Sequence, residues 1–329
     1  MNPTDIHLLR AFLAAGDAFV SGSVLAEEVG LTRVAIWARL EKLRENGFVF
    51  EAVRNRGYRL LKTPSHLDGR LVAAHLALTG AERTLHFHPS IDSTNSEAER
   101  LLATSGTAPF VVAAAGQTKG RGRLGRVWHS PAEGNLYASF AFRPRIAHRR
   151  IATITLWMGA GLCDYLERAW GVPVQVKWPN DLLIQGRKVA GILTEARIDA
   201  DLTRELVIGI GLNIQGNTAA WPAEASRVAT TLTEHASAPL PVNAVAAGFI
   251  ETVFQLYEAF IAETHREAFP MLWKKYDALA GKTIRASMNG RELSGEAAGI
   301  DGDGALLLQA TDGQTHRLHS GEVTIGSGR

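Results

Sequence analysis

Three short helical patterns followed by a hairpin pattern occupy the first 62 residues, and this order constrains the fold more than any other feature. Residues 5–15 carry apolar side chains at helical spacing. Residues 21–30 predict a short second helix that ends at Gly30, and Thr32 can cap a third helix over residues 33–46. A helix, a tight turn with glycine and a second helix predict a helix-turn-helix unit.

Two strand patterns follow these helices and predict a basic hairpin. Residues 48–53 and 58–60 flank a turn at 54–57 that carries two arginines. Residues 31–62 hold eight basic and three acidic side chains, a net charge of +5. A positive helix for the major groove and a hairpin that reaches phosphates are typical of a winged helix that binds duplex DNA.

The side chains that we expect to contact DNA lie on the third helix and in the hairpin turn: Thr32, Arg33, Trp37, Arg39, Lys42, Arg54 and Arg56. Trp37 lies inside the third helix, where it can face either the core or DNA. The alternative for the whole unit is a small helical interaction module with a solvated charged face. Residues 63–65 predict the linker out of this domain, which we place at residues 1–63.

Composition places the whole chain among cytoplasmic globular proteins. The 329 residues are 46% hydrophobic and 21% charged, and they are enough for two or three domains. No apolar run reaches the roughly 18 residues of a membrane helix, and the N-terminus lacks the pattern of a signal peptide. The single cysteine, Cys163, excludes an internal disulfide and metal sites built on cysteine pairs.

Helical and extended patterns alternate from residue 67 to 273, which predicts an α/β or α+β domain. Strands are expected at 84–88 and 110–115, and long amphipathic helices at 151–170 and 245–264. Between the two strands, Thr94 and Glu97 have capping-box spacing, so Ser93, Thr94 and Asn95 should lie at a helix N-terminus. Such a terminus can hold a polar ligand, although an ordinary capped helix explains the motif equally.

An arginine- and glycine-rich loop at residues 117–126 follows the second strand. It places four positive charges within residues 119–126. Its glycines allow close approach of the backbone to a ligand, and its arginines offer paired donors to phosphate oxygens. We expect the loop to be mobile until an anion binds. The alternative is a flexible, solvated surface turn.

Two common nucleotide-binding motifs are excluded. Gly120, Gly122 and Gly125 match GxGxxG, but no helix follows and no acid lies near position 145, so a dinucleotide fold is excluded. A Walker A loop is absent too, because Tyr276 precedes Gly281-Lys282-Thr283 where the first glycine is needed. Anion binding by this loop is therefore expected in a fold other than a dinucleotide-binding or Walker A fold.

Three further motifs follow the loop in order. KWPND at 177–181 is extended before its proline and ends in Asn180 and Asp181, which can hold Mg²⁺ or a ribose. Residues 182–193 predict a hairpin with Lys188 on the returning strand, either reaching out to water or positioned for anion chemistry. VIGIGLNI at 207–214 is an apolar strand whose glycines permit close approach, with Asn213 near its end.

QTKGRGRLGRVW, KWPND, GRKVAGIL and GIGLN, in this order, resemble the biotin–protein ligase family over essentially the whole chain. With a winged helix in front, the chain is similar to the bifunctional bacterial form that also represses the biotin operon. The resemblance implies an α+β protein of three domains. These are the winged helix, a central mixed α/β domain of the biotin/lipoate ligase type at residues 67–273, and an SH3-like β-barrel at 276–329.

The resemblance implies a two-step reaction in the cytoplasm. Biotin and ATP, with Mg²⁺, form biotinyl-5′-AMP, and a lysine of the carrier domain of acetyl-CoA carboxylase then takes the biotin. Operator DNA and a ligand-promoted homodimer are further implied. No protein-only metal site is expected, since Mg²⁺ comes with ATP, near Asp181.

The resemblance also implies roles for single residues. Lys188 and Arg123 correspond to catalytic positions. The biotin contacts correspond to Ser93, Thr94, Asn95, Gln117, Arg121, Gly122, Arg123 and Lys188. The ATP contacts correspond to Gly120, Arg123, Trp128, Asn180, Asp181 and Asn213. One departure is Leu124, which stands where some members carry a basic residue.

The tail at 282–326 has strand patterns with turns at 289–290, 301–304 and 312–313, which predict five or six strands. Three alternatives for function stay open: a ligand-sensing transcription factor without catalysis, a lipoate ligase, and a ligase with a vestigial winged helix. His86 and His88 have no third metal ligand in the pattern, Cys163 fits helix packing, and His129 beside the loop is ambiguous.

Overall fold

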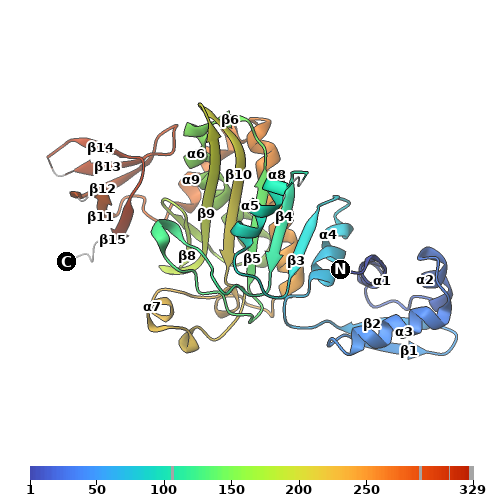
Figure 1. Ribbon diagram of the computed structural model, residues 1–329. Helices are drawn as coiled ribbons and strands as arrows, with labels where there is room; N and C mark the ends of the chain where they lie inside the picture. Colours follow the sequence, from blue (N-terminus) through green and yellow to red (C-terminus); the bar gives the residue numbers. More distant parts are fainter. Residues whose placement is uncertain (105–106, 289–290, 311, 326–329) are drawn as a thin grey trace.

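The N-terminal part of the chain is a winged helix, as predicted. The computed structural model describes residues 1–104, 107–288, 291–310 and 312–325 (Figure 1). Helices α1 (Pro3–Ala15), α2 (Gly22–Glu28) and α3 (Arg33–Arg44) precede the antiparallel strands β1 (Val49–Val53) and β2 (Gly57–Lys62). Thr32 caps α3 by accepting a hydrogen bond from the Ala35 amide at 3.2 Å. The helix ends two residues before the predicted Asn46.

The winged helix packs directly on the rest of the protein. Leu71 and Ala74 of α4 (Gly69–Leu78) are buried in the same apolar cluster as Leu8, Leu9 and Phe12 of α1. The connecting segment is anchored as well, because the Asn243 side chain bonds the backbone of His66 and Asp68. The orientation of the winged helix is therefore fixed by packing rather than by a free linker.

The central part is a mixed sheet with helices on both faces. Its strand order is β3-β4-β5-β10-β9-β8-β7, with β6 beside β10, and of these pairs only β3–β4 is parallel among the described residues. The strands are β3 (Leu85–His88), β4 (Phe110–Ala114), β5 (Leu136–Phe142), β6 (Ile146–Ala147), β7 (Gln175–Lys177), β8 (Asp181–Ile184), β9 (Arg187–Asp199) and β10 (Leu202–Leu212).

Successive side chains of a strand point to opposite faces of the sheet, and apolar side chains on both faces explain the two helical layers. On β10, Leu206 and Ile208 join the main core, which includes α6 (Ile151–Trp170) and α8 (Val242–Ile261), while Val207 faces α5 (Thr94–Thr104). Helix α9 (His265–Tyr276) also packs on α6. The predicted span of α6 agrees with the structure. Helix α8 lies three residues before its predicted span of 245–264, because it begins directly after Pro241.

Helix α8 is long and apolar enough to cross a membrane by length and composition, but half of that window is buried inside the protein. It packs against α4 and α6, as a core helix does. The remaining short helices, which lie in loops, are Arg123–Gly125, His148–Arg150, Thr218–Ala220, α7 (Ala223–Ser226) and Leu232–Glu234.

The C-terminal part is a five-stranded antiparallel sheet in the order β14-β13-β12-β11-β15. Its strands are β11 (Thr283–Met288), β12 (Arg291–Ile300), β13 (Leu306–Ala310), β14 (Thr315–Leu318) and β15 (Glu322–Ile325). Positive φ angles at Gly304 and Gly313 fit the predicted turns there, whereas the turn predicted at 289–290 lies outside the described residues. The Trp178 indole donates to the Gly304 carbonyl at 3.0 Å, which ties this sheet to the central domain.

Candidate functional site

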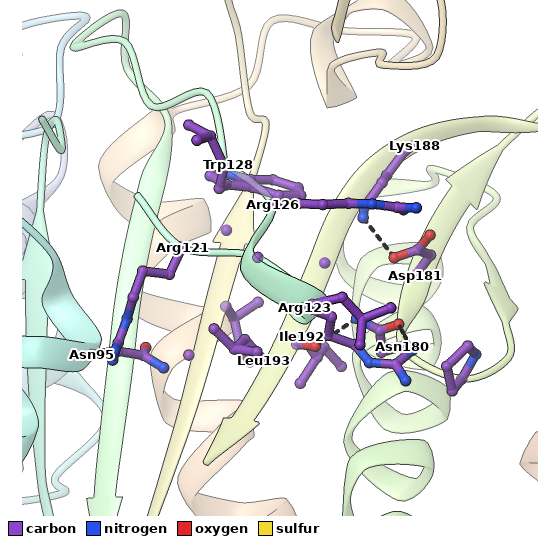
Figure 2. A pocket seen from close by; sticks show the side chains of 18 of the residues that line it. Asn95, Arg121, Arg123, Arg126, Trp128, Asn180, Asp181, Lys188, Ile192 and Leu193 are labelled. Atoms are coloured by element: carbon purple, nitrogen blue, oxygen red, sulfur yellow. Dashed lines mark hydrogen bonds and ion pairs between the residues drawn. The ribbon is translucent and has the colours of Figure 1, made fainter. Parts of the chain in front are cut away.

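A cavity of about 330 Å³ lies over the glycine-bearing strands of the central sheet (Figure 2). This volume lies within the range of small-molecule sites. Residues 321–324 of the C-terminal sheet complete the rim. The cavity brings together most of the predicted ligand residues: Ser93, Thr94, Asn95, Gln117, Arg121, Gly122, Arg123, Trp128, Asn180, Asp181 and Lys188. Gly120 and Asn213 are not among its lining residues.

Three glycines of β9 and β10 line the cavity at places where the side chains above them leave no room for a Cβ atom. A Cβ on Gly209 would lie 2.0 Å from Asn95 Oδ1, and one on Gly211 would lie 2.4 Å from Trp128 Nε1. A Cβ on Gly191 would lie 2.9 Å from the Trp128 ring. The close approach predicted for the strand glycines is therefore made by Asn95 and Trp128.

One end of the cavity is a neutral, hydrogen-bonded cluster. The Thr94 amide and hydroxyl both donate to Gln117 Oε1, at 2.8 and 3.0 Å. Gln117 Nε2 donates to Ser130 Oγ at 3.0 Å, which fixes the orientation of the amide. The predicted capping box is wrong, because Thr94 is the first residue of α5 and its hydroxyl binds Gln117, while Glu97 pairs with Arg100.

Two residues that contact Thr94, Asn95 or Arg121 at this end of the cavity were not predicted from the sequence. Ser139, fully buried on β5, lies 2.8 Å from Thr94 Oγ1 and also bonds Asn95 Oδ1. Glu195 on β9 accepts from Asn95 Nδ2 at 2.6 Å and from Arg121 at 2.8 Å. The signal for Ser139 was available, since it is the one serine or threonine in the apolar run 136–142. Nothing local marks Glu195.

The arginine loop closes one side of the cavity, and each of its arginines holds a different part of the rim. Arg121 pairs with Glu195, Arg123 donates to Asn180 Oδ1 at 3.1 Å, and Arg126 forms an ion pair with Glu322 of β15. Figure 2 shows Arg121 directed toward Asn95, and Arg123 and Arg126 toward the side where Asn180 and Asp181 lie. The loop thus spans the whole cavity.

Two loop glycines and Leu124 have different roles from the arginines. Gly120, for which an ATP contact was predicted, does not line the cavity. It packs against the backbone instead, because a Cβ there would lie 2.4 Å from the Trp128 carbonyl oxygen. Gly122 does line the cavity. Leu124 has a positive φ of 56° and is 76% exposed, so a long basic side chain would also fit at this position.

The other end of the cavity is cationic. Lys188 Nζ lies 2.6 Å from Asp181 Oδ1 and 4.9 Å from the centre of the Trp128 ring. Of the two alternatives for Lys188, the structure favours a position inside the site over one reaching out to solvent. The buried Trp128 Nε1 lies against Gly211 and has no hydrogen-bond partner within the described part of the chain.

Lys177 is a second lysine at this end, which the sequence interpretation did not assign. It lines the cavity, and burial lowers the pKa of its ammonium group, against the opposing effect of nearby Asp181. Every loop arginine has an acidic or amide partner, whereas no ion pair within 4.0 Å is found for Lys177 among residues whose positions are described. A half-buried cation whose nearby carboxylate, Asp181, is already paired with Lys188 favours binding of an anion.

Asn213 lies behind the cavity rather than on its wall. It is 2% exposed, and its Nδ2 donates to the Thr230 carbonyl at 3.1 Å. The segment at 228–230 pairs in turn with the backbone of Lys188, through bonds of 2.6 and 2.9 Å. Asn213 therefore braces the segment that positions Lys188, which differs from the predicted direct contact with ATP.

The described ranges contain no group of three or more His, Cys, Asp or Glu side chains that could hold a metal ion. Asp181 is the acid nearest to the cationic end, and it pairs with Lys188. A magnesium ion at this end would need most of its oxygen ligands from phosphate groups and water.

The predicted DNA-binding surface is largely exposed, but two of its arginines make internal contacts. Trp37 is 52% exposed, so the alternative of a core position is wrong. Arg39 lies 3.6 Å from the carboxylate of buried Asp5, and Arg56 stacks 4.2 Å from the centre of the Phe19 ring. Arg56 remains in the hairpin turn at the wing tip, whereas Arg39 points toward the protein.

Three family models match consecutive parts of the chain. They are an HTH domain at residues 5–59, the Biotin/lipoate A/B protein ligase family at 87–213, and the Biotin protein ligase C terminal domain at 280–326. The matches follow the three structural parts in order.

Individual relatives cover nearly the full chain. The Bifunctional ligase/repressor BirA of Bacillus subtilis is 33% identical over 322 residues, 97% of this chain and 98% of its own. The Biotin--[acetyl-CoA-carboxylase] ligase of Paracoccus denitrificans is 32% identical over 71% of this chain and 98% of its own. The biotin protein ligase of Aquifex aeolicus, solved with biotin and ATP, covers 74% of this chain and 100% of its own, at 26% identity and a TM-score of 0.63.

Proposed function

This chain belongs to the family of bifunctional biotin protein ligases and repressors, and from that premise we propose that it activates biotin with ATP and transfers it to a carrier protein. In the first step a carboxylate oxygen of biotin bonds to the α-phosphorus of ATP, and pyrophosphate leaves. In the second step a lysine amine of the carrier bonds to the biotinyl carbonyl carbon, AMP leaves, and the amine loses a proton.

The observation that carries this proposal is the division of one cavity into a neutral end and a cationic end. Thr94, Asn95 and Gln117 offer donors and acceptors without net charge, which suits the ureido group of biotin. Lys188 and Lys177 supply positive charge at the opposite end, which suits a carboxylate and phosphates. A ligand spanning both ends has its carboxylate close to the α-phosphate.

Lys188 and Arg123 are the proposed catalytic residues. Charge develops on the phosphate oxygens as the new P–O bond forms, and fixed cations in a cavity closed from water stabilise it. Asp181 and the Trp128 ring hold Lys188 in place before any ligand arrives. Trp128, which lines the cavity, offers a flat apolar surface to the adenine. Magnesium bound with ATP would neutralise further phosphate charge, near Asp181.

For the acceptor we propose the biotin carrier domain of acetyl-CoA carboxylase, because the name of the Paracoccus relative gives acetyl-CoA carboxylase as its substrate. The incoming lysine must reach the cationic end. Residues 321–324 of β15 and its preceding turn line that cavity, so the C-terminal sheet lies where a carrier domain would dock. The reducing cytoplasm is the proposed location, and it agrees with one buried, unpaired cysteine, Cys163.

For repression we propose a ligand-promoted homodimer joined at the edge of β9. Strand β8 pairs with β9 only over Arg187 to Gly191, so the outer side of residues 192–199 has no strand beside it in the part of the sheet that is described. An open edge can pair with the same edge of a second copy. Glu195 on this edge forms an ion pair with Arg121 of the loop. A ligand that contacts Arg121 would therefore change the position or the charge environment of Glu195 at the edge.

The test of the ligase proposal is isotope exchange between pyrophosphate and ATP. We expect exchange that requires biotin and Mg²⁺, because step one is reversible without a carrier. Lipoate added in place of biotin distinguishes the lipoate ligase alternative, which predicts exchange with lipoate alone. The absence of exchange with either acid would support a ligand-sensing transcription factor without catalysis. A mobility shift with and without biotin and ATP tests whether the winged helix is active or vestigial.

A further inference from the structure

The outer face of α3 exposes apolar side chains where a DNA-binding helix meets the bases. Val34 is 74% exposed and Trp37 is 52% exposed. Their i, i+3 spacing puts them on one face, whereas Ile36, Leu40 and Leu43 are buried on the opposite face. Both lie in the first half of the helix, directly after the Thr32 cap. Large apolar groups exposed together mark a binding surface.

The surroundings of this pair indicate what covers it. Arg33 precedes Val34, Lys42 lies five residues beyond Trp37, the hairpin turn carries Arg54 and Arg56, and the net charge of residues 31–62 is +5. Cations around an apolar centre match a duplex, whose phosphates lie on both sides of the groove. A second copy of this chain, docked through the same face, would instead leave these like charges facing each other.

The major groove offers one apolar group, the C5-methyl of thymine. Val34 has no hydrogen-bonding atoms, and the Trp37 indole has a single donor. Arg39, the basic residue in the middle of α3, is held beside Asp5 at 3.6 Å and is directed away from this face. The middle of the exposed face is therefore better suited to contact an apolar group on a base than to form hydrogen bonds with it.

We infer that Val34 and Trp37 recognise thymine methyl groups in the operator, so that this protein selects sequences with thymines under the first half of α3. The inference rests on the proposed DNA-binding function and adds its chemical basis. Phosphate contacts by Arg33, Lys42 and Arg54 supply affinity without base preference, and the two apolar side chains supply the preference.

The test replaces the methyl group and nothing else. Full-length protein with biotin, ATP and Mg²⁺ is used to select binding duplexes from a pool with a randomised centre. Each enriched duplex is then made again with deoxyuridine in place of single thymidines. We expect about fourfold weaker binding per methyl lost, the effect of burying one carbon. The Val34→Ala or Trp37→Ala protein should lose this difference between thymine and uracil.

Two matched controls separate base reading from general affinity. Arg54→Ala should weaken binding to thymine and uracil duplexes equally, since it removes a phosphate contact. Val24→Ala removes an apolar side chain that is 46% exposed on α2, off the α3 face, and should leave the discrimination unchanged.

Three results would overturn the inference. Tight binding with equal affinity for thymine and uracil at every position contradicts methyl reading and leaves the DNA-binding function intact. Discrimination that persists in both alanine variants places the reader elsewhere on the protein. If no sequence is enriched, the proposed DNA binding itself is wrong, and the inference falls with it.

Discussion

Lys188 and Asp181 form an ion pair across the β8–β9 hairpin, with Nζ 2.6 Å from Oδ1. The two residues lie on paired strands that diverge from the Gln185-Gly186 turn, where positive φ angles of 50° and 79° allow a two-residue hairpin. Strand pairing places Lys188 opposite Leu183 and Asp181 opposite Gly191, with a register shift between Leu182 and Leu183. The lysine side chain spans this offset and reaches the carboxylate at the cationic end of the cavity. This geometry is the source of the first prediction.

Replacing Lys188 with methionine should lower the rate of biotin-dependent ATP–pyrophosphate exchange by about 10²- to 10³-fold, the usual cost of one transition-state donor. Methionine keeps the packing on Trp128 and removes only the charge. The matched control is Lys275→Met, since Lys275 pairs with Glu167 on the helical side of the protein. Equal losses in both variants would contradict a specific role for Lys188.

Substitution of two nearby glycines, Gly209 and Gly211, should affect biotin binding and ATP binding differently. Gly209→Ala brings a methyl group against Asn95, and we expect it to raise the KM for biotin more than the KM for ATP. Gly211→Ala brings one against Trp128 and should raise the KM for ATP more. Gly302→Ala is the control, because a Cβ there meets nothing within 4 Å and Gly302 has no positive φ. The same pattern for Gly209→Ala and Gly211→Ala would refute the division of the cavity.

The ammonium group of Lys177 should make ATP binding sensitive to alkaline pH. Burial lowers the pKa of this lysine below its ordinary 10.5, so its charge is complete below the lowered pKa and is lost as the pH rises through it. We expect the KM for ATP to rise over that range. Bound phosphate favours the charged form, so the effect should be smaller at saturating ATP.

Two substitutions isolate this titration. Lys177→Met should weaken ATP binding about tenfold at neutral pH, an effect of about 1.4 kcal/mol, and should flatten the alkaline rise. Lys177→Arg should retain binding and stay charged throughout. An unchanged pH profile in both variants would assign the alkaline rise to another group.

Removal of residues 1–63 should destabilise the ligase part, because Leu71 and Ala74 of α4 lose the core that they share with α1. We expect the midpoint of thermal unfolding to fall by several degrees. Leu71→Gln in the truncated chain should recover part of the loss, since it makes the newly exposed face polar. In the full-length chain the same substitution should destabilise. A truncated chain as stable as the full one would show that the two parts are independent.

The sequence predicted best those elements whose pattern is local and long. The 20 residues of α6 and the two-residue turn at Gln185-Gly186 agree with the structure, because apolar periodicity and turn chemistry act within a few residues. The cap of α5 was mispredicted for the opposite reason. Gln117, remote in sequence, competes for the Thr94 hydroxyl and takes it from the capping box.

The sequence allowed most residues of the candidate site to be predicted, but not the contacts that they make with one another. Motif order pointed to Lys188, Trp128 and Asp181, whereas Glu195 could be assigned only once the sheet placed β9 beside α5. The Arg126–Glu322 pair is another such contact, since it joins the loop to a strand almost 200 residues later. Pairings of this kind follow from tertiary packing, which no local pattern encodes.

The most direct measurement of the central claim is transfer of biotin to protein. The chain is mixed with ATP, Mg²⁺, biotin and a carrier-domain fragment of acetyl-CoA carboxylase, and bound biotin is detected with streptavidin. We predict a labelled carrier with the wild-type chain, no label when ATP is omitted, and almost none with Lys188→Met. A carrier that stays unlabelled by folded wild-type protein would contradict the assignment of this cavity to biotin ligation.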